Sequence, residues 1–139
     1  MPKAANIRLL RPTSGILGFH DGRIEGLRLH GPQPNRPDDG GLTLGTCSYA
    51  IVSDGEALVY DTHMSLDHAG WIREAVAGEG ATRISIVLSH HHLDHIAGNA
   101  VFQDCEIIAN ASTAAAMGAE LDAAHKADPP VNPVIMPTT

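Results

Sequence analysis

The feature that most constrains this chain is a short apolar segment that runs directly into a cluster of histidines. Ile84 to Leu88 is rich in β-branched side chains, as buried strands usually are. The cluster that follows contains His90, His92, Asp94 and His95. Residues two apart in an extended segment point the same way, so His90 and His92 can bind one ion. The pattern predicts a metal site at the carboxyl end of a strand, where α/β proteins usually place their sites.

The chemistry of the cluster favours a metal site over a solvated polar loop or a purification tag. Imidazole and carboxylate bind borderline divalent metals such as Zn²⁺ at about 2.0–2.2 Å. A tag would not contain Leu93 and Asp94 or follow a buried strand. Asp94 and His95 are consecutive, so the backbone must bend for both to face one site; we expect a short helical turn there, with Asp94 near its cap. Metal-assisted hydrolysis is therefore the first hypothesis.

The remaining pattern predicts an α/β (α+β) domain that starts with antiparallel strands and continues with alternating strands and helices. Asp54-Gly55 is a strong hairpin signal between two apolar segments. Ser65 can cap a helix that ends near Gly78, and Asn110 can cap a later helix. The predicted strands are 24–30, 46–53, 56–61, 84–88 and 105–109; the predicted buried helix faces are Leu66, Ala69, Ile72 and Val76, then Ala114, Met117 and Leu121. Trp71 is expected to pack at the edge of the first helix face, with substrate stacking as the alternative.

Two segments resemble the metallo-β-lactamase-fold superfamily. Leu88 to Asn99 is similar to its signature loop, His-x-His-x-Asp-His followed by a small residue and glycine. Ala57 to Thr62 is similar to the apolar strand ending in Asp-Thr that precedes the family's first helix. The resemblance extends from about Thr46 to Asn110, and the two motifs together are much more specific than either alone.

The resemblance implies two divalent metal ions, zinc in the first place, with iron or manganese as alternatives. His90 and His92 would bind the first ion, and Asp94 and His95 the second. Asp61 would be the carboxylate that orients the metal loop, a support such sites commonly need. The alternative for Asp61 is an ordinary strand-end residue that accepts hydrogen bonds from turn amides.

The activity implied is hydrolysis by a metal-bound hydroxide, with Asp94 as both ligand and orienting group for the nucleophile. The substrate would be a small molecule carrying an ester, thioester, lactone or related bond. Two alternatives stay open. The chain could be a noncatalytic metal-binding or interaction module, or an iron-dependent oxidoreductase of the same superfamily.

The family builds an αββα sandwich from two sheet-plus-helix halves, and residues 1–139 match only the N-terminal half. The stretch 128–139 resembles the connector toward the second half, and no residue here matches the family's later ligands. We therefore expect activity only when a C-terminal half, from a longer or separate chain, completes the domain. The chain alone is expected to be inactive, and self-association of a natural half is the alternative.

Other histidines and one loop receive ordinary interpretations. The family usually has glycine after Asp-Thr, whereas this chain has His63, which we expect to be a surface loop residue. His20, His30 and His68 match no ligand position, and His125 is expected to be solvated near a helix end. The proline-rich loop from Gly31 to Gly41 is either a lid over the metal site or an ordinary surface loop.

Composition limits the partners. Nine basic and 16 acidic residues give a net charge of −7, which disfavours a general nucleic-acid binder. The N-terminus lacks the apolar core of a signal peptide and no segment is apolar enough to cross a membrane, so we expect a cytoplasmic protein. Cys47 and Cys105 are expected to be free thiols, because they are far apart in sequence.

Overall fold

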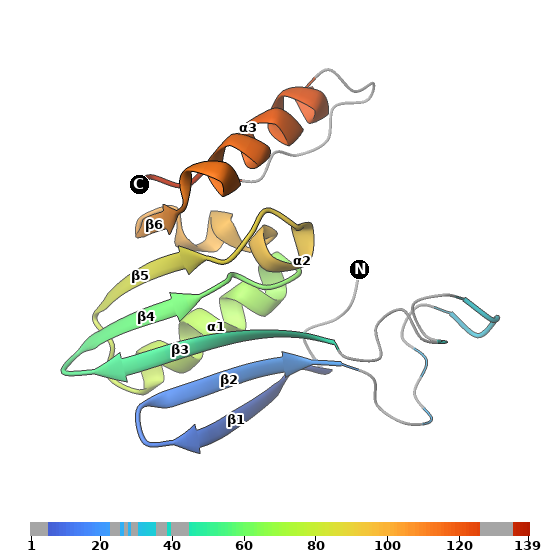
Figure 1. Cartoon of the computed structure of the whole chain (residues 1–139). Coiled ribbons are helices and arrows are strands. Elements are labelled where there is room, and N and C mark those ends of the chain that lie inside the picture. The colour runs from blue at the N-terminus through green and yellow to red at the C-terminus, as the bar shows by residue number, and fades with distance from the viewer. Residues whose placement is uncertain are drawn as a thin grey trace.

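The computed structural model describes residues 6–22, 26, 28, 31–35, 39, 45–125 and 135–139. One sheet of six strands runs in sequence order from β1 to β6 (Figure 1). The pairs from β1 to β4 are antiparallel, and β4–β5 and β5–β6 are parallel. The expected α/β class, with one sheet and helices, is confirmed. The strands are β1 Arg8–Thr13, β2 Ile16–Asp21, β3 Thr46–Ser53, β4 Glu56–Tyr60, β5 Arg83–Leu88 and β6 Glu106–Ala109.

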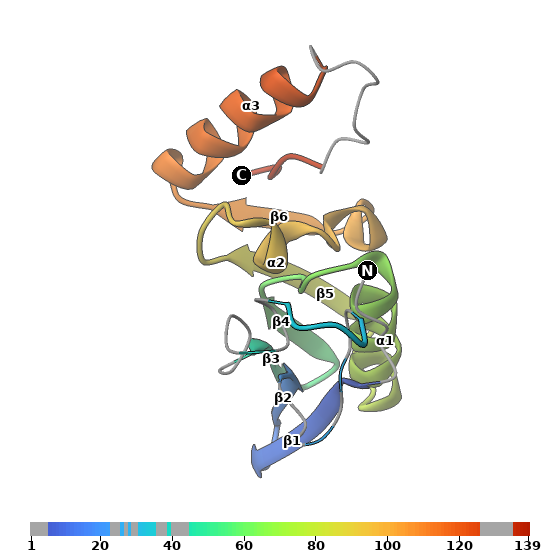
Figure 2. The same cartoon turned by 90° about the vertical axis from the view of Figure 1, so that its right-hand side faces the viewer.

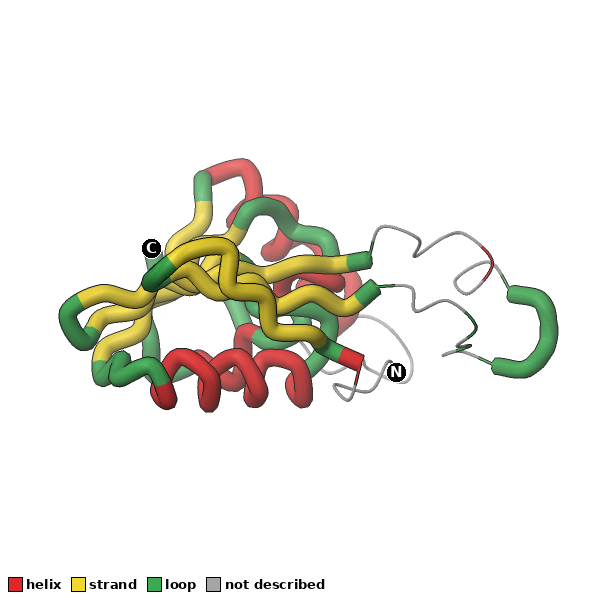
Figure 3. The backbone as a smooth tube through the Cα atoms, turned by 90° about the horizontal axis from the view of Figure 1, so that it is seen from below, coloured by secondary structure: helices red, strands yellow, loops and turns green. Residues whose placement is uncertain are grey.

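The helices lie in the connections between the parallel strands β4, β5 and β6, and after β6. They are α1 Leu66–Gly78, α2 Leu93–Ile96, the 3₁₀ turn η3 Asn99–Phe102 and α3 Ala111–His125. Helix α1 packs along one face of the twisted sheet (Figure 3), while α3 lies beyond the β6 edge (Figure 2). No helix in the described ranges is both long and apolar enough to cross a bilayer.

The local signals explain most of these elements. Asp54 and Gly55 have φ angles of 52° and 79°, the left-handed pair that a tight hairpin turn needs. The Ser65 hydroxyl accepts a hydrogen bond from the His68 amide at 3.3 Å, which caps α1 as predicted. Trp71 packs edge-on against Phe19, with ring centroids 5.9 Å apart, so its expected packing role is confirmed.

Helix α3 also begins as predicted. The Asn110 side chain accepts a hydrogen bond from the Thr113 amide at 2.9 Å. Met117 is buried, Ala114 and Leu121 are only half-buried, and Thr113 adds a buried position that the apolar pattern did not include. Both cysteines are free, and each is half-buried.

The first two strands were not predicted. β1 carries two arginines and a proline and is largely exposed, so it shows no apolar alternation. β2 contains Gly18 and the buried Asp21, which also interrupt the pattern. The strand predicted over Ile24 to His30 falls almost entirely outside the described residues, and Gly26 and Arg28 within it are not in a strand. Much of the loop from Gly31 to Gly41 also lies outside them, and the lid remains a prediction.

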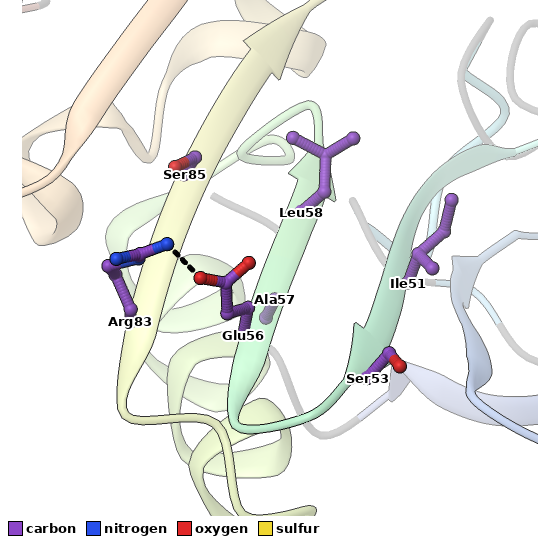
Figure 4. A pocket seen from close by; sticks show the side chains of 7 residues that line it. All are labelled: Ile51, Ser53, Glu56, Ala57, Leu58, Arg83 and Ser85. Atoms are coloured by element: carbon purple, nitrogen blue, oxygen red, sulfur yellow. Dashed lines mark hydrogen bonds and ion pairs between the residues drawn. The ribbon is translucent and has the colours of Figure 1, made fainter.

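The core lies between the sheet and α1, and the opposite face of the sheet is open. Residues in register share a face, so Tyr49, Tyr60, Ile51 and Leu58 all project from the open face. These four side chains are 42–53% exposed. Figure 4 shows a hollow on this side that extends to the Arg83–Glu56 ion pair. The hollow is at the start of β5, the opposite end of that strand from the histidine cluster.

The outer edge of β6 is covered by the described C-terminal residues. The Ile107 carbonyl accepts hydrogen bonds from the amides of Thr138 and Thr139 at 2.7 and 3.1 Å. The Ala109 amide donates to the Thr139 carbonyl at 2.9 Å, and the Ile107 amide donates to the Thr138 hydroxyl at 2.8 Å. The residues from 128 to 134 lie outside the described ranges, so the connector assigned to 128–139 stays a prediction.

Candidate metal centre

The site is built at the carboxyl ends of the neighbouring parallel strands β4 and β5. Asp61 directly follows β4, and its amide donates to the Val87 carbonyl at 2.9 Å, which holds the two strand ends together. Its backbone then turns with a φ of 66°, a left-handed conformation that few residues other than glycine adopt. This turn directs the Asp61 carboxylate toward the loop after β5.

The Asp61 carboxylate is buried and accepts three hydrogen bonds from the loop. The Ser89 amide donates to Oδ1 at 2.7 Å, and the Ser89 hydroxyl donates to Oδ2 at 2.7 Å. His95 Nδ1 lies 2.8 Å from Oδ2. A carboxylate that holds one ring nitrogen of a histidine leaves the other nitrogen free to bind a metal. The structure thus joins Asp61 to the loop by three hydrogen bonds, and its role in orienting metal ligands stays a prediction.

The side chains assigned to the metals gather next to Asp61. The ring centroid of His90 is 4.6 Å from that of His92 and 4.2 Å from that of His95. Asp94 Oδ2 lies 3.4 Å from His95 Nε2. Two ligands at about 2.1 Å from a tetrahedral ion are about 3.4 Å apart, so this pair fits one metal ion. Within the described ranges, however, no group of three or more His, Cys, Asp or Glu side chains is arranged to hold an ion.

The electrostatics of the loop keep the His90 imidazole available for a metal. Partial burial lowers the pKa of His90, and the neighbouring His95 and His92 lower it further, because a second positive charge nearby is unfavourable. A neutral imidazole carries the lone pair that a metal ligand needs. The donor set, the spacing of the Asp94–His95 pair and the hydrogen bonds to Asp61 therefore fit divalent metal binding.

Two residues outside the cluster, Thr46 and Glu120, contact it and were missed in the sequence. The Thr46 hydroxyl donates to Asp94 Oδ2 at 3.1 Å, from the start of β3. β3 is antiparallel to β4, so its start lies at the edge where β4 ends, and this neighbour could have been anticipated from the hairpin. His91, the histidine outside the ligand pattern, lies 3.5 Å from Glu120 of α3.

The turn after Asp61 is docked tightly against the loop. The Thr62 amide donates to the His95 carbonyl at 2.8 Å, and its hydroxyl donates to the Asn99 side-chain oxygen at 2.7 Å. Gly98 lies so close that a methyl group there would collide with the Thr62 carbonyl oxygen and with Ala69 of α1. The glycine of the signature loop is thus required by close packing between the two motifs.

The expectation for His63 was wrong. This side chain is completely buried and stacks on His68, with ring centroids 4.6 Å apart and planes 9° from parallel. Its Nε2 lies 3.1 Å from the Phe19 carbonyl, to which it must donate. The backbone φ of 68° explains why glycine is usual here. Among the described residues, His63 Nδ1 has no hydrogen-bond partner.

His68 is also part of a buried polar network. Its Nε2 lies 2.6 Å from Asp21 Oδ2, and its Nδ1 lies 2.7 Å from the Ser65 hydroxyl. All three side chains are at most 5% exposed, so this Ser–His–Asp arrangement cannot meet a substrate from solvent. It ties β2 to the start of α1. Sequence reasoning missed it because the three residues are separated by up to 47 positions.

The buried His63 predicts a specific loss of stability in acid. Burial, and secondly the neighbouring His68, lower the pKa of His63 to about 4. An unfolded histidine takes up a proton near pH 6.5, whereas the folded state stays neutral down to about pH 4. Unfolding therefore binds a proton in this range, and His63 should reduce the free energy of unfolding by roughly 3 kcal/mol as pH falls from 6.5 to 4.

Urea unfolding at a series of pH values tests this expectation. His63→Gln is the matched variant, because its side-chain amide can still donate to the Phe19 carbonyl but does not titrate. Its unfolding free energy should fall less steeply between pH 6.5 and 4 than that of the unaltered chain. Parallel curves for the two proteins would contradict the assignment.

Comparison with known proteins identifies the family of this chain. Residues 41–125 match the family model described as the metallo-beta-lactamase superfamily, and these residues include both motifs. No match was found among curated protein sequences.

Solved metallo-β-lactamases have a similar fold. The DIM-1 metallo-β-lactamase matches with a TM-score of 0.64 and 17% identity over 83% of this chain and 47% of its own. TMB-1 matches with a TM-score of 0.64 and 16% identity over 86% and 49%. VMB-1 matches with a TM-score of 0.63 and 18% identity over 83% and 48%. The chain thus spans about half the length of these structures. With the family model covering more than half of its residues, this chain belongs to the metallo-β-lactamase superfamily.

Proposed function

We propose that this chain is part of a metal-dependent hydrolase that cleaves an ester, thioester, lactone or related bond in a small molecule. The observation that supports the proposal most directly is the hydrogen bond between His95 Nδ1 and the buried Asp61 carboxylate. It leaves His95 Nε2 beside Asp94, in an arrangement suited to a metal ion. Membership of the superfamily supports metal-dependent hydrolysis as the reaction class.

Each predicted ligand has a role in the proposal. His90 and His92 would hold the first ion, and Asp94 and His95 the second. Divalent ions bound there, zinc or alternatively iron or manganese, supply a water of lowered pKa and polarise the scissile bond. Asp94 lies at the exposed rim, with a side chain that is 48% exposed, so it can also orient the attacking water. Asp61 and Thr46 hold the loop and the Asp94 carboxylate in place.

We further propose that activity requires a completing C-terminal half, from a longer or a separate chain. This chain covers only 47–49% of the length of the solved structures that it matches. The open face carries Tyr49, Ile51, Leu58 and Tyr60, an apolar surface that soluble proteins usually cover. That half would also supply the remaining metal ligands. A self-associated pair of identical chains would cover the face but would not supply them.

One observation favours the noncatalytic alternative for the chain alone. The described residues bring together no group of three or more ligands for one ion. Weak metal binding without turnover is therefore the expected behaviour of the 139-residue chain by itself.

Metal analysis combined with native mass spectrometry tests the proposal. A complex of this chain with its completing half should contain about two ions and hydrolyse members of an ester, thioester and lactone panel. His92→Ala should remove the first ion, whereas His91→Ala, one position away and turned toward Glu120, should retain it. A metal-free complex, or equal metal content in both variants, would refute the assignment. Metal without turnover would instead support the noncatalytic module.

A further inference from the structure

The Ser89 hydroxyl lies between a buried carboxylate and a predicted metal ligand. Its oxygen is 2.7 Å from Asp61 Oδ2 and 2.8 Å from His90 Nδ1. Both distances are those of good hydrogen bonds. The Ser89 amide also donates to Asp61 Oδ1 at 2.7 Å, so the residue is fixed on two sides by the same carboxylate.

The direction of the two hydrogen bonds at the Ser89 hydroxyl follows from the number of hydrogens available. A serine hydroxyl has a single hydrogen to donate. If it pointed at His90, two oxygen acceptors would face each other across 2.7 Å at Asp61 without a hydrogen between them. The hydroxyl therefore donates to the Asp61 carboxylate, and its oxygen accepts from His90 Nδ1–H. Neutral His90 then has its free lone pair on Nε2.

We propose that Ser89 is a positioning residue that selects the metal-binding nitrogen of His90. Asp61 would thereby control one histidine of each predicted metal pair, His95 by direct contact and His90 through the Ser89 hydroxyl. The metal-binding consequence rests on the proposed function. The selection of the ring nitrogen does not, because it is a property of the metal-free chain.

This arrangement makes different predictions for the two histidines. Ser89→Ala removes the hydroxyl but keeps the backbone amide that donates to Asp61. His90 should lose its fixed Nδ1–H form, whereas His95 should keep it, because its contact with Asp61 is direct. Ser89→Thr retains a hydroxyl at the same branch point and should behave like the unaltered chain.

Nitrogen-15 NMR of the imidazoles in the metal-free full chain tests the proposal, at alkaline pH where histidine rings are neutral. We expect His90 and His95 to be protonated at Nδ1 in the unaltered chain and in Ser89→Thr. In Ser89→Ala, only His90 should shift toward protonation at Nε2. An unchanged His90 signal in Ser89→Ala, or a shift of equal size at His95, would overturn the proposal.

Zinc titration of the same variants gives the second measurement. Loss of a residue that orients a ligand typically weakens metal binding by about 10–100-fold. Ser89→Ala should weaken the site that contains His90 by about 10-fold, with rescue in Ser89→Thr. If the expected NMR shift occurs but no zinc binds to any variant, even with the completing half present, the proposed function fails while the role of Ser89 stands. If zinc binds equally to all three proteins, Ser89 does not position a ligand.

Discussion

Replacing Asp61 with asparagine is expected to lower the affinity for each of the two predicted metal ions by about 10–100-fold. The Asp61 carboxylate accepts from Ser89 twice and from His95 once, so every contact uses it as an acceptor. Asparagine has nearly the same shape, but one of its two groups is a donor. The amide nitrogen would face the Ser89 N–H in one orientation and the Nδ1–H of His95 in the other. Two donors facing each other in a buried site cost about 1–3 kcal/mol and displace the loop.

Competition with a metal chelator measures the two affinities, and thermal unfolding measures the accompanying loss of stability. Asp67→Asn is the control. Asp67 is an exposed carboxylate in the first turn of α1, and its replacement removes the same charge. It should bind metal as the unaltered chain does. If Asp61→Asn and Asp67→Asn are indistinguishable, Asp61 does not orient the loop, and an ordinary strand-end role is the better interpretation.

Gly98→Ala is expected to be among the most destabilising single changes in the chain, by about 3 kcal/mol. The φ of Gly98 is −88°, which any residue can adopt, so the backbone conformation does not require glycine. The space does: the added methyl would meet the Thr62 carbonyl oxygen and Ala69 on opposing elements. Neither neighbour can rotate away, because one is backbone and the other is buried in α1.

Chemical denaturation compares this variant with Gly70→Ala. Gly70 lies within α1, and apart from the helix's own backbone and the adjacent residues nothing lies within 4 Å of the position that a methyl group would occupy. That change should stabilise the chain by about 0.4–1 kcal/mol through reduced flexibility of the unfolded state. The opposite signs of the two variants separate close packing from helix propensity. Equal stability of Gly98→Ala and the unaltered chain would mean that the turn and the loop do not pack as the structure shows.

Much of the sheet next to the site could be predicted because its signals are local. The Asp54-Gly55 turn, the Ser65 cap and the apolar strand before the histidines each occupy a few consecutive residues. The resemblance of the two motifs then identified the family. β1 and β2 lacked such signals, because an edge strand with charged residues and a strand with a buried aspartate show no regular alternation.

The contacts around the site were harder to predict because they join distant residues. Thr46 reaches Asp94 across 48 positions, and His63 reaches the Phe19 carbonyl across 44. For His63 the sequence predicts a surface loop position. Its burial depends on a backbone turn with positive φ and on the stacking partner His68, neither of which a single sequence displays. The ligand roles of His90, His92, Asp94 and His95 remain predictions that the metal titrations will decide.

The hydrogen bonds that the last residues make to β6 restrict how this sheet can assemble with anything else. Unpaired strand edges are templates on which another chain can add a strand. At β6 the backbone groups of Ile107 and Ala109 are already used by Thr138 and Thr139. Strand addition at these two residues of β6 is therefore blocked as long as Thr138 and Thr139 are paired there. The exposed apolar face of β3 and β4 is unaffected by this pairing, so it is the part of the sheet that is open to a second layer.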